Sequence, residues 1–254
     1  MDTTPLPEGR PEQPTRRAFL RGIPVITAGA LGLSPAARAA EGGRAHHWAM
    51  LVDLRKCIGC QACTVACIHE NHVPEGSFRT VVSTYAVALA EAADQPARSV
   101  MLPRLCNHCE NPPCVPVCPV GATFKRPNGE VVVNADRCVG CAYCVQACPY
   151  DARFINHETN KADKCTFCAH RLEAGLLPAC VETCVGGARL FGDLNDADGQ
   201  LRRELAAAGD QVKVLKPEQH TSPNVFYIGL DARFEGKVAG EAARWAPLSH
   251  GGQS

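Results

Sequence analysis

Three short apolar segments of the chain predict β-strands. They are Ala49–Leu54, Val131–Val133 and Val225–Ile228, and each has the length and composition of a buried strand. The first two stand shortly before a loop that is rich in cysteine. The third follows all the cysteines, and it could also be a segment that docks on a partner.

A fourth segment, Asp196–Ala208, has the apolar spacing of an amphipathic helix. The apolar residues on one side of this helix are Leu201, Leu205 and Ala208. We expect the helix and the strand at 225–228 to pack over the rest of the fold as parts of a C-terminal extension.

The apolar run Ile23–Leu33 predicts a signal peptide. Arg16 and Arg17 precede it, and Ala37-Arg-Ala39 follows as a small-residue cleavage site, so residues 1–39 have the layout of a twin-arginine signal. A retained membrane anchor needs about 18 or more apolar residues, and this run is shorter and contains Pro24. We therefore expect export in the folded state to the periplasm, with no span left in the mature chain and membrane contact only through a partner.

Composition excludes some classes of function. The 254 residues carry 26 basic and 26 acidic side chains without a basic stripe, so nucleic acid is not an expected partner. The 16 cysteines are unusual for a globular domain, and they require disulfides, metal or a cofactor. Twin-arginine export favours a cofactor, because that route carries proteins that fold and are loaded in the reducing cytoplasm.

The cysteines form four groups of four along the chain. Groups one and three have the spacing C-x2-C-x2-C-x3-C, and group three is followed by proline, which is the bacterial ferredoxin motif. Group one differs only in having Ile68 at the proline position. The members are Cys57, Cys60, Cys63 and Cys67 (group one), Cys106, Cys109, Cys114 and Cys118 (group two), Cys138, Cys141, Cys144 and Cys148 (group three), and Cys165, Cys168, Cys180 and Cys184 (group four).

This spacing suits [4Fe–4S] clusters, which need four thiolates each. Three cysteines two residues apart wrap three corners of a cube, and the fourth ligates a neighbouring cluster. Structural zinc favours two C-x2-C pairs with a longer spacer, which only group four resembles. Cysteines two apart in a tight loop seldom reach disulfide geometry. We therefore expect four [4Fe–4S] clusters, with iron bound through all sixteen cysteines.

The segments around the groups repeat. Residues 118–124 align with residues 148–154 and more loosely with residues 184–190, and a strand, a cysteine loop and a short helix recur in order. The predicted fold class is α+β and loop-rich, with two ferredoxin-like modules that bind two clusters each. Spacing alone leaves the pairing of the groups open, since group three could pair with group two or with group four. The region from about 69 to 100 and the spacer 169–179 are expected to be surface insertions.

Several segments resemble the iron–sulfur subunits of molybdopterin oxidoreductases, and most closely the beta subunits of tetrathionate reductases. The likeness runs from about residue 46 to 230, and the cysteine pattern is diagnostic of the broad family. The segments that carry it are Met50–Cys60, Leu102–Cys109, Pro112–Pro119, Arg137–His157, Lys164–Gly187, Lys216–Glu218 and Val225–Leu230.

The resemblance implies nested modules, the first formed by residues 40–100 and 158–254 and the second by residues 101–157. It also implies four ligand sets, which we number one to four. They are Cys57, Cys60, Cys63 and Cys184 (set one), Cys67, Cys165, Cys168 and Cys180 (set two), Cys106, Cys109, Cys114 and Cys148 (set three), and Cys118, Cys138, Cys141 and Cys144 (set four).

The function that the resemblance implies is electron transfer in anaerobic respiration. Electrons would pass from a quinol-oxidising membrane subunit through the clusters to a molybdopterin-containing catalytic subunit that reduces tetrathionate. No nucleophile–base pair, phosphate loop or dinucleotide fingerprint is recognisable, so we expect no catalytic residue in this chain. The alternatives are the same role in a polysulfide, thiosulfate, sulfite or arsenate oxidoreductase, a free-standing polyferredoxin, and a binding protein stabilised by zinc or disulfides.

Some residues near the loops have a predicted supporting role. Two histidines, His108 and His170, are expected to form structural hydrogen bonds, because thiolates already fill every ligand position. Four basic residues either raise the cluster potentials or are solvated surface charges. These four are Lys56, Arg137, Lys164 and Arg171.

Overall fold

The computed structural model describes residues 46–87, 98–230 and 238–244. All sixteen cysteines are among them. The predicted signal peptide, residues 1–39, lies outside the described residues.

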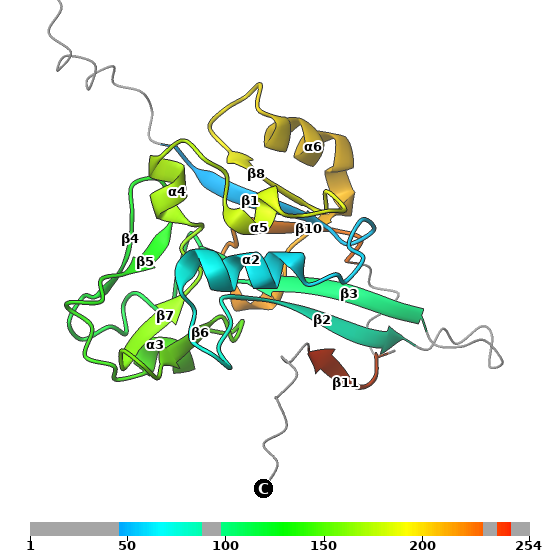
Figure 1. Cartoon of the computed structure of the whole chain (residues 1–254). Coiled ribbons are helices and arrows are strands. Elements are labelled where there is room, and N and C mark those ends of the chain that lie inside the picture. The colour runs from blue at the N-terminus through cyan, green and yellow to red at the C-terminus, as the bar shows by residue number, and fades with distance from the viewer. Residues whose placement is uncertain (1–45, 88–97, 231–237, 245–254) are drawn as a thin grey trace, which may run out of the picture. The chain divides into compact units, whose positions relative to one another are not determined.

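Four strands form one sheet with the order β8-β1-β10-β9 (Figure 1). Its central strand β1 (Trp48–Asp53) pairs parallel with β10 (Val225–Ile228) and antiparallel with β8 (Arg189–Asp193). The short β9 (Val212–Lys213) pairs antiparallel with β10. The predicted strands at 49–54 and 225–228 are therefore confirmed, and they are neighbours although most of the chain separates them.

The other described strands form smaller sheets. A three-stranded sheet contains β11 (Val238–Arg244), β2 (Thr80–Val87) and β3 (Arg98–Leu105), in that order. Two hairpins pair β4 (Thr123–Lys125) with β5 (Val131–Val133) and β6 (Arg153–Asn156) with β7 (Lys161–Lys164). The β6–β7 hairpin lies across the predicted module boundary at residues 157 and 158.

The prediction that the region from about 69 to 100 is a surface insertion is wrong for β2. The side chains of Thr80 and Val82 are only 3% and 2% exposed, and β2 pairs along its full length with β3. Val82 packs in the same apolar cluster as Leu105 and several cysteines. The spacer 169–179 does lie mostly at the surface, with Leu176 and Leu177 exposed.

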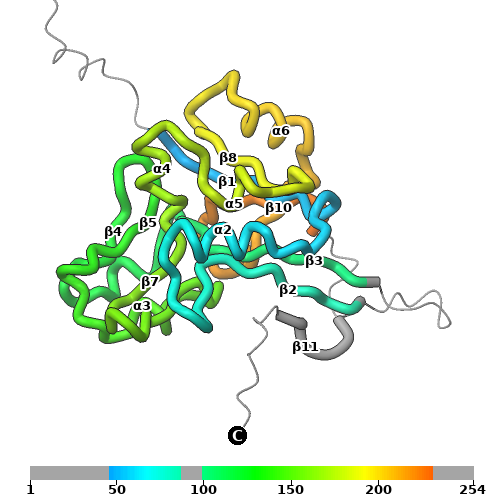
Figure 2. The backbone as a smooth tube through the Cα atoms, viewed as in Figure 1, coloured from blue at the N-terminus to red at the C-terminus, as the bar shows by residue number. Residues whose placement is uncertain are grey.

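Short helices follow the cysteine loops. They are α2 (Ala62–Asn71), α3 (Tyr143–Gln146), α4 (Ala169–Glu173) and α5 (Ala179–Glu182). The tube in Figure 2 shows α2 and α5 near one another, and the two helices are in contact. Three of these helices bring cysteines inward, with Cys63 and Cys67 on α2, Cys144 on α3 and Cys180 on α5.

The predicted C-terminal helix is α6 (Gln200–Ala208), and it begins four residues later than its apolar pattern suggested. Residues 196–199 instead form a turn, in which the amide of Gly199 donates to the carbonyl of Asp196. Leu201 is buried against Gly192 of β8. A side chain in place of this glycine would collide with Cβ of Leu201, so the glycine lets the helix approach the sheet. The chain then continues through short 3₁₀ turns at Gly209–Gln211 and Pro217–Gln219.

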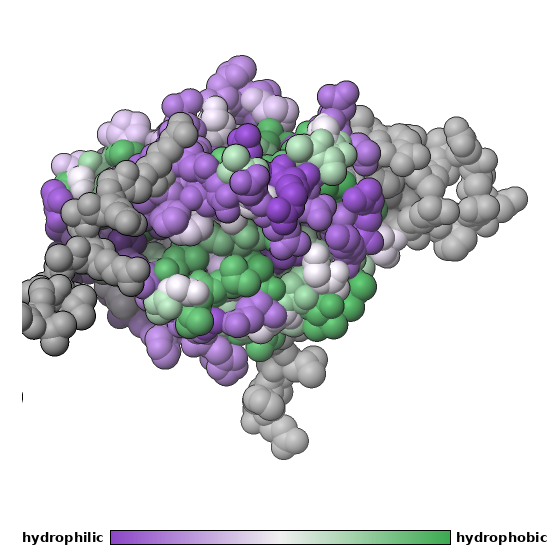
Figure 3. All heavy atoms as spheres, turned by 90° about the horizontal axis from the view of Figure 1, so that it is seen from above, coloured by the Kyte–Doolittle hydropathy of each residue, from purple (hydrophilic) through white to green (hydrophobic). Residues whose placement is uncertain are grey.

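In the described part of the chain the core consists of three apolar clusters, of which two are built around cysteines. One contains Cys63, Cys106, Cys165 and Cys180 together with β1 side chains, and another contains Cys114, Cys138 and Cys144. The third has no cysteine, and it joins Ala49, Leu51, Leu201 and Ile228 between the sheet and α6. Figure 3 shows further apolar patches at the surface, set among polar side chains.

Candidate iron–sulfur cluster site

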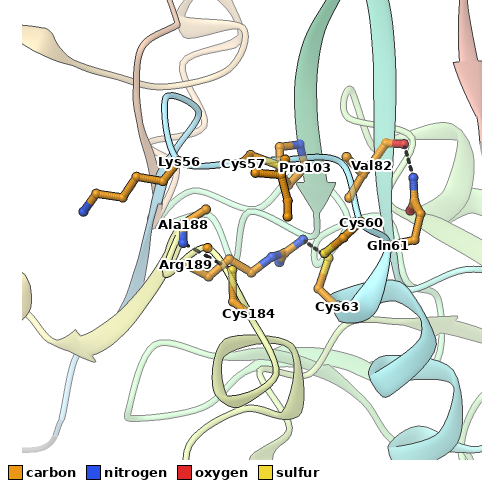
Figure 4. A pocket seen from close by; sticks show the side chains of 12 residues that line it. Lys56, Cys57, Cys60, Gln61, Cys63, Val82, Pro103, Cys184, Ala188 and Arg189 are labelled. Atoms are coloured by element: carbon orange, nitrogen blue, oxygen red, sulfur yellow. Dashed lines mark hydrogen bonds between the residues drawn. The ribbon is translucent and has the colours of Figure 1, made fainter.

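The cysteines of set one gather around one cavity. Cys57, Cys60 and Cys63 come from the loop between β1 and α2 and from α2 itself, and Cys184 follows α5. All four line a cavity of about 350 Å³ (Figure 4). The sequence groups one and four therefore meet here, as the nested arrangement requires.

The cysteines of set two line a second cavity, of about 290 Å³. Cys67 comes from the last turns of α2, Cys165 and Cys168 from the loop after β7, and Cys180 from α5. Helix α2 carries one cysteine of each set, Cys63 and Cys67. Helix α5 carries Cys180 of set two and is followed by Cys184 of set one. About one turn of the chain therefore separates a ligand of the first cavity from a ligand of the second.

The cysteines of set three are close to one another in a buried environment. The pKa of Cys109 is raised to about 11: burial is the largest cause, a hydrogen bond with Thr221 lowers the pKa, and the thiolates of Cys106, Cys114 and Cys148 raise it. Charge interactions weaken with distance, so these effects fit a common site for the four sulfurs.

Three cysteines of set four pack in the second apolar cluster. They are Cys118, Cys138 and Cys144, and Cys141 of the same loop is exposed. Cys114 of set three packs in the same cluster. Sets three and four are therefore neighbours, as sets one and two are.

The loops of groups one and three have the same unusual backbone. Gly59 and Gln61 have φ of +72° and +62°, and Gly140 and Ala142, at the equivalent positions, have +72° and +63°. Such left-handed residues turn successive amide groups inward and form anion-binding nests, which are known around iron–sulfur clusters. The sequence pattern C-x2-C-x2-C therefore specifies a loop that can stabilise a negatively charged group.

Amide groups also donate to the cysteine sulfurs. The amide of Ala122 lies 3.2 Å from Sγ of Cys118, and the amide of Ala188 lies 3.2 Å from Sγ of Cys184. Both alanines stand four residues after the cysteine, so the repeat in the sequence is a repeat in hydrogen bonding. Three amides lower the pKa of Cys118 although burial alone would raise it.

Several of the buried thiols are hard to ionise without metal. Burial raises the pKa of Cys67 to about 12 and that of Cys180 to about 11, and neighbouring thiolates add to the effect at both. Metal-binding cysteines must lose their protons, so metal has to replace protons in these cavities. Sets of four thiols that are mostly buried or half-buried, with amides that donate to sulfurs, fit an anionic [4Fe–4S] cube.

One glycine of the third loop permits no side chain. A Cβ at Gly140 would lie 2.3 Å from the carbonyl oxygen of Asn160, in addition to the positive φ. Gly76 has nearly the same φ, +74°, but nothing within 4 Å of a Cβ. It is therefore a matched control for the cost of the backbone conformation alone.

We expect Gly76→Ala to lower the melting temperature by about 2–8 °C, because a left-handed alanine costs roughly 1–2 kcal/mol. Gly140→Ala is expected to lower it at least twice as far and to reduce the iron content, because the backbone of the loop must also shift. Thermal unfolding and iron analysis of both variants check this. Equal losses in the two variants would show that the close approach to Asn160 has no role.

The two histidines form the expected structural hydrogen bonds. Nδ1 of the fully buried His108 accepts from the amide of Val131 at 3.1 Å, and its ring stacks on Phe167 with ring centroids 3.7 Å apart. Burial, together with the charges of Lys164 and Arg153, lowers the pKa of His108, so its ring is neutral. His170 at the surface contacts Glu70 at 2.8 Å.

The four basic residues named from the sequence differ in their environment. Lys56 is 55% exposed, and Arg137 is also exposed. Arg171 forms ion pairs with Glu70 and Glu182. Lys164 is only 1% exposed, and its ammonium donates to the carbonyl oxygens of Val131 and Cys165, so the interpretation as a solvated surface charge is wrong for it.

Two buried arginines beside the cysteines were not among these predictions. Arg153 begins β6 and Arg189 begins β8, and both donate to cysteine sulfurs. The repeat in the sequence could have identified them, since each stands five residues after the last cysteine of its group, Arg153 after group three and Arg189 after group four.

Among the residues that the structure describes, no helix has both the length and the apolar character that a membrane span needs.

The chain is similar to known iron–sulfur proteins. Two patterns of the 4Fe-4S dicluster domain match the chain, one at residues 56–122 and one at residues 97–194. Among the relatives are the tetrathionate reductase B subunits of two organisms. The one from Salmonella typhimurium is 59% identical over 236 residues, which cover 90% of this chain and 93% of that protein. The one from Archaeoglobus fulgidus is 43% identical, with 71% of this chain and 81% of that protein covered. The thiosulfate reductase electron transfer subunit PhsB of Salmonella typhi is 49% identical, with 61% and 80% covered.

Proposed function

Because the chain belongs to the family of iron–sulfur B subunits that carry the 4Fe-4S dicluster domain, we propose that it is the electron-transfer subunit of a tetrathionate reductase. It connects a quinol-oxidising membrane subunit with a molybdopterin-containing catalytic subunit. The observation that carries this proposal is the 59% identity to one of the tetrathionate reductase B subunits over nearly the full length of both chains.

The role of this chain is to hold four [4Fe–4S] clusters through sets one to four. When bound, each cluster supplies a site for one electron. The cysteine loops and helices would hold the sites in two neighbouring pairs, sets one and two and sets three and four. In the first pair, about one turn of α2 separates Cys63 of set one from Cys67 of set two. The cavities of sets one and two, and the shared electrostatics of set three, support this assignment.

We place the protein in the periplasm, exported in the folded state. The twin arginines ahead of the apolar run at 23–33 support this location. Since the clusters would be inserted before export, the cysteines would remain available as ligands in an oxidising compartment. Attachment to the membrane would then depend on the partner subunit.

A thiosulfate reductase is the second candidate, because the electron transfer subunit PhsB is 49% identical to this chain. The two candidates differ in the catalytic partner and share the electron-transfer role. Purification of the complex through this chain, followed by assays with tetrathionate and with thiosulfate as electron acceptors, separates them. Tetrathionate reduction by the co-purified large subunit is the expected result, and activity with thiosulfate alone would reject the first candidate.

Replacement of Cys141 by serine is expected to separate electron transfer from catalysis. This cysteine is exposed, so its loss removes one ligand of set four without opening a cavity in the core. Quinol-dependent activity should fall at least about tenfold, while activity with an artificial dye that reduces the catalytic subunit directly should partly survive. Iron content and electron paramagnetic resonance (EPR) spectra of the variant check the loss. Unchanged iron and spectra would show that Cys141 is no ligand.

A further inference from the structure

Arg153 and Arg189 occupy equivalent places in the two modules. Each follows the last cysteine of its group by five residues, and each is the first residue of a strand. Both side chains are buried, with 3% and 4% of their surface exposed. A repeat of the sequence has therefore placed one buried guanidinium in each module.

The guanidinium of Arg189 lies between sets one and two. Its Nη2 is 3.5 Å from Sγ of Cys63, which belongs to set one, and its Nη1 is 3.7 Å from Sγ of Cys180, which belongs to set two. Nη2 also donates to Oγ1 of Thr80 at 2.8 Å. Figure 4 shows the side chain reaching across the first cavity toward Cys63.

Arg153 has the same relation to sets three and four. Its Nη2 is 3.0 Å from Sγ of Cys114 in set three, and, against the lowering effect of burial, the negative charge of the Cys144 thiolate in set four also raises the pKa of Arg153. Its Nη1 lies 3.3 Å from Oγ1 of Thr123, so a threonine hydroxyl accompanies the arginine in both modules.

The counter-charges of both arginines are sulfurs. Neither arginine takes part in the carboxylate ion pairs found among the described residues. A guanidinium is positively charged at any physiological pH, and burying it is costly unless an anion compensates it. Burial would lower the pKa of Arg189, but the thiolates of Cys180 and Cys63 keep it above its usual value. Each arginine is therefore suited to lie beside negatively charged groups that are bound by cysteines.

We propose that Arg153 and Arg189 are paired positioning residues, each of which holds one permanent positive charge between the two cluster sites of its module and raises the reduction potentials of both. The proposal rests on the proposed function, since it requires clusters in the sets. A positive charge favours the state with one more electron, and its effect is large where water is excluded. One charge placed between two sites shifts both potentials of a module in the same direction.

The test replaces each arginine by glutamine in the loaded, full-length protein and measures all four midpoint potentials by redox titration with EPR detection. Arg189→Gln is expected to lower two of the four potentials by at least 59 mV, a tenfold change for a one-electron couple. Arg153→Gln is expected to lower the other two. Lys56→Gln is the control, because Lys56 borders the first cavity but is exposed, and it should leave all four nearly unchanged.

Iron analysis accompanies each titration. A variant with full iron content in which no potential falls, or only one does, would overturn the proposal, as would an equal fall in all four. If a glutamine variant fails to retain iron, the lysine variant of the same arginine is titrated. Lysine keeps the positive charge, so the same two potentials should stay within 59 mV of the wild-type values, and a fall of 59 mV or more despite the retained charge rejects the proposal. Wild-type protein without iron would instead reject the proposed function.

Discussion

Cys184→Ser is expected to remove the same cluster as Cys57→Ser, and Cys180→Ser the same cluster as Cys67→Ser. Cys180 lies on the short helix α5 and Cys184 follows that helix, but the two cysteines line different cavities. Each variant should lose roughly a quarter of its iron, because each set of four thiolates holds one of four clusters. Electron transfer to the catalytic subunit should fall at least about a hundredfold, since an interrupted relay has no alternative path.

EPR spectra of the four reduced variants check the pairing. Two identical pairs of spectra are expected, each lacking a different signal. Iron analysis of each variant is the control for general loss of structure, because a collapsed protein would lose far more than a quarter. Matching spectra from Cys180→Ser and Cys184→Ser would contradict the nested pairing.

Removal of iron by a chelator is expected to unfold the cysteine-lined part of the core. Cysteines make up half of the six buried residues in the cluster around Ala122, Val131 and Ala162, so little apolar surface remains to hold it together. Metal binding and folding are coupled where the ligands form the core. The melting temperature should fall by more than about 10 °C.

The cysteine-free cluster between the sheet and α6 provides an internal control for this experiment. Amide hydrogen exchange should accelerate first in β5, which carries Val131, and later in β1 near Leu51, which packs against Leu201. Uniform acceleration would show that the protein unfolds as one unit. Protection of β5 that survives the loss of iron would show that its packing does not depend on metal.

The features that could be predicted from the sequence are those set by local pattern. The strands at 131–133 and 225–228 have the predicted bounds, because short apolar runs between turn residues have few alternatives. The spacing of groups one and three fixed the loop geometry, since Gly59 and Gly140 adopt the positive φ that the tight turn needs. Membership in the iron–sulfur subunit family and the electron-transfer role were predicted and are confirmed by the relatives.

The features that could not be predicted depend on tertiary burial. Lys164 and Arg137 both stand beside a cysteine in the sequence, yet only Lys164 is enclosed. Nothing local in residues 80–87 shows that β2 packs against the cysteines of the core. Arg153 and Arg189 were identifiable from the repeat, but their contacts with cysteine sulfurs follow from the meeting of distant segments.

Sixteen cysteine thiolates are proposed to hold four iron–sulfur cubes in this chain. This is tested by the iron, zinc and acid-labile sulfide content of the full-length protein purified without oxygen. About sixteen iron and about sixteen sulfide ions per chain and no zinc are expected, because each cube has four of each and four cysteine ligands. Folded protein that contains zinc, or that contains no sulfide, would show that the cysteines do not hold such cubes.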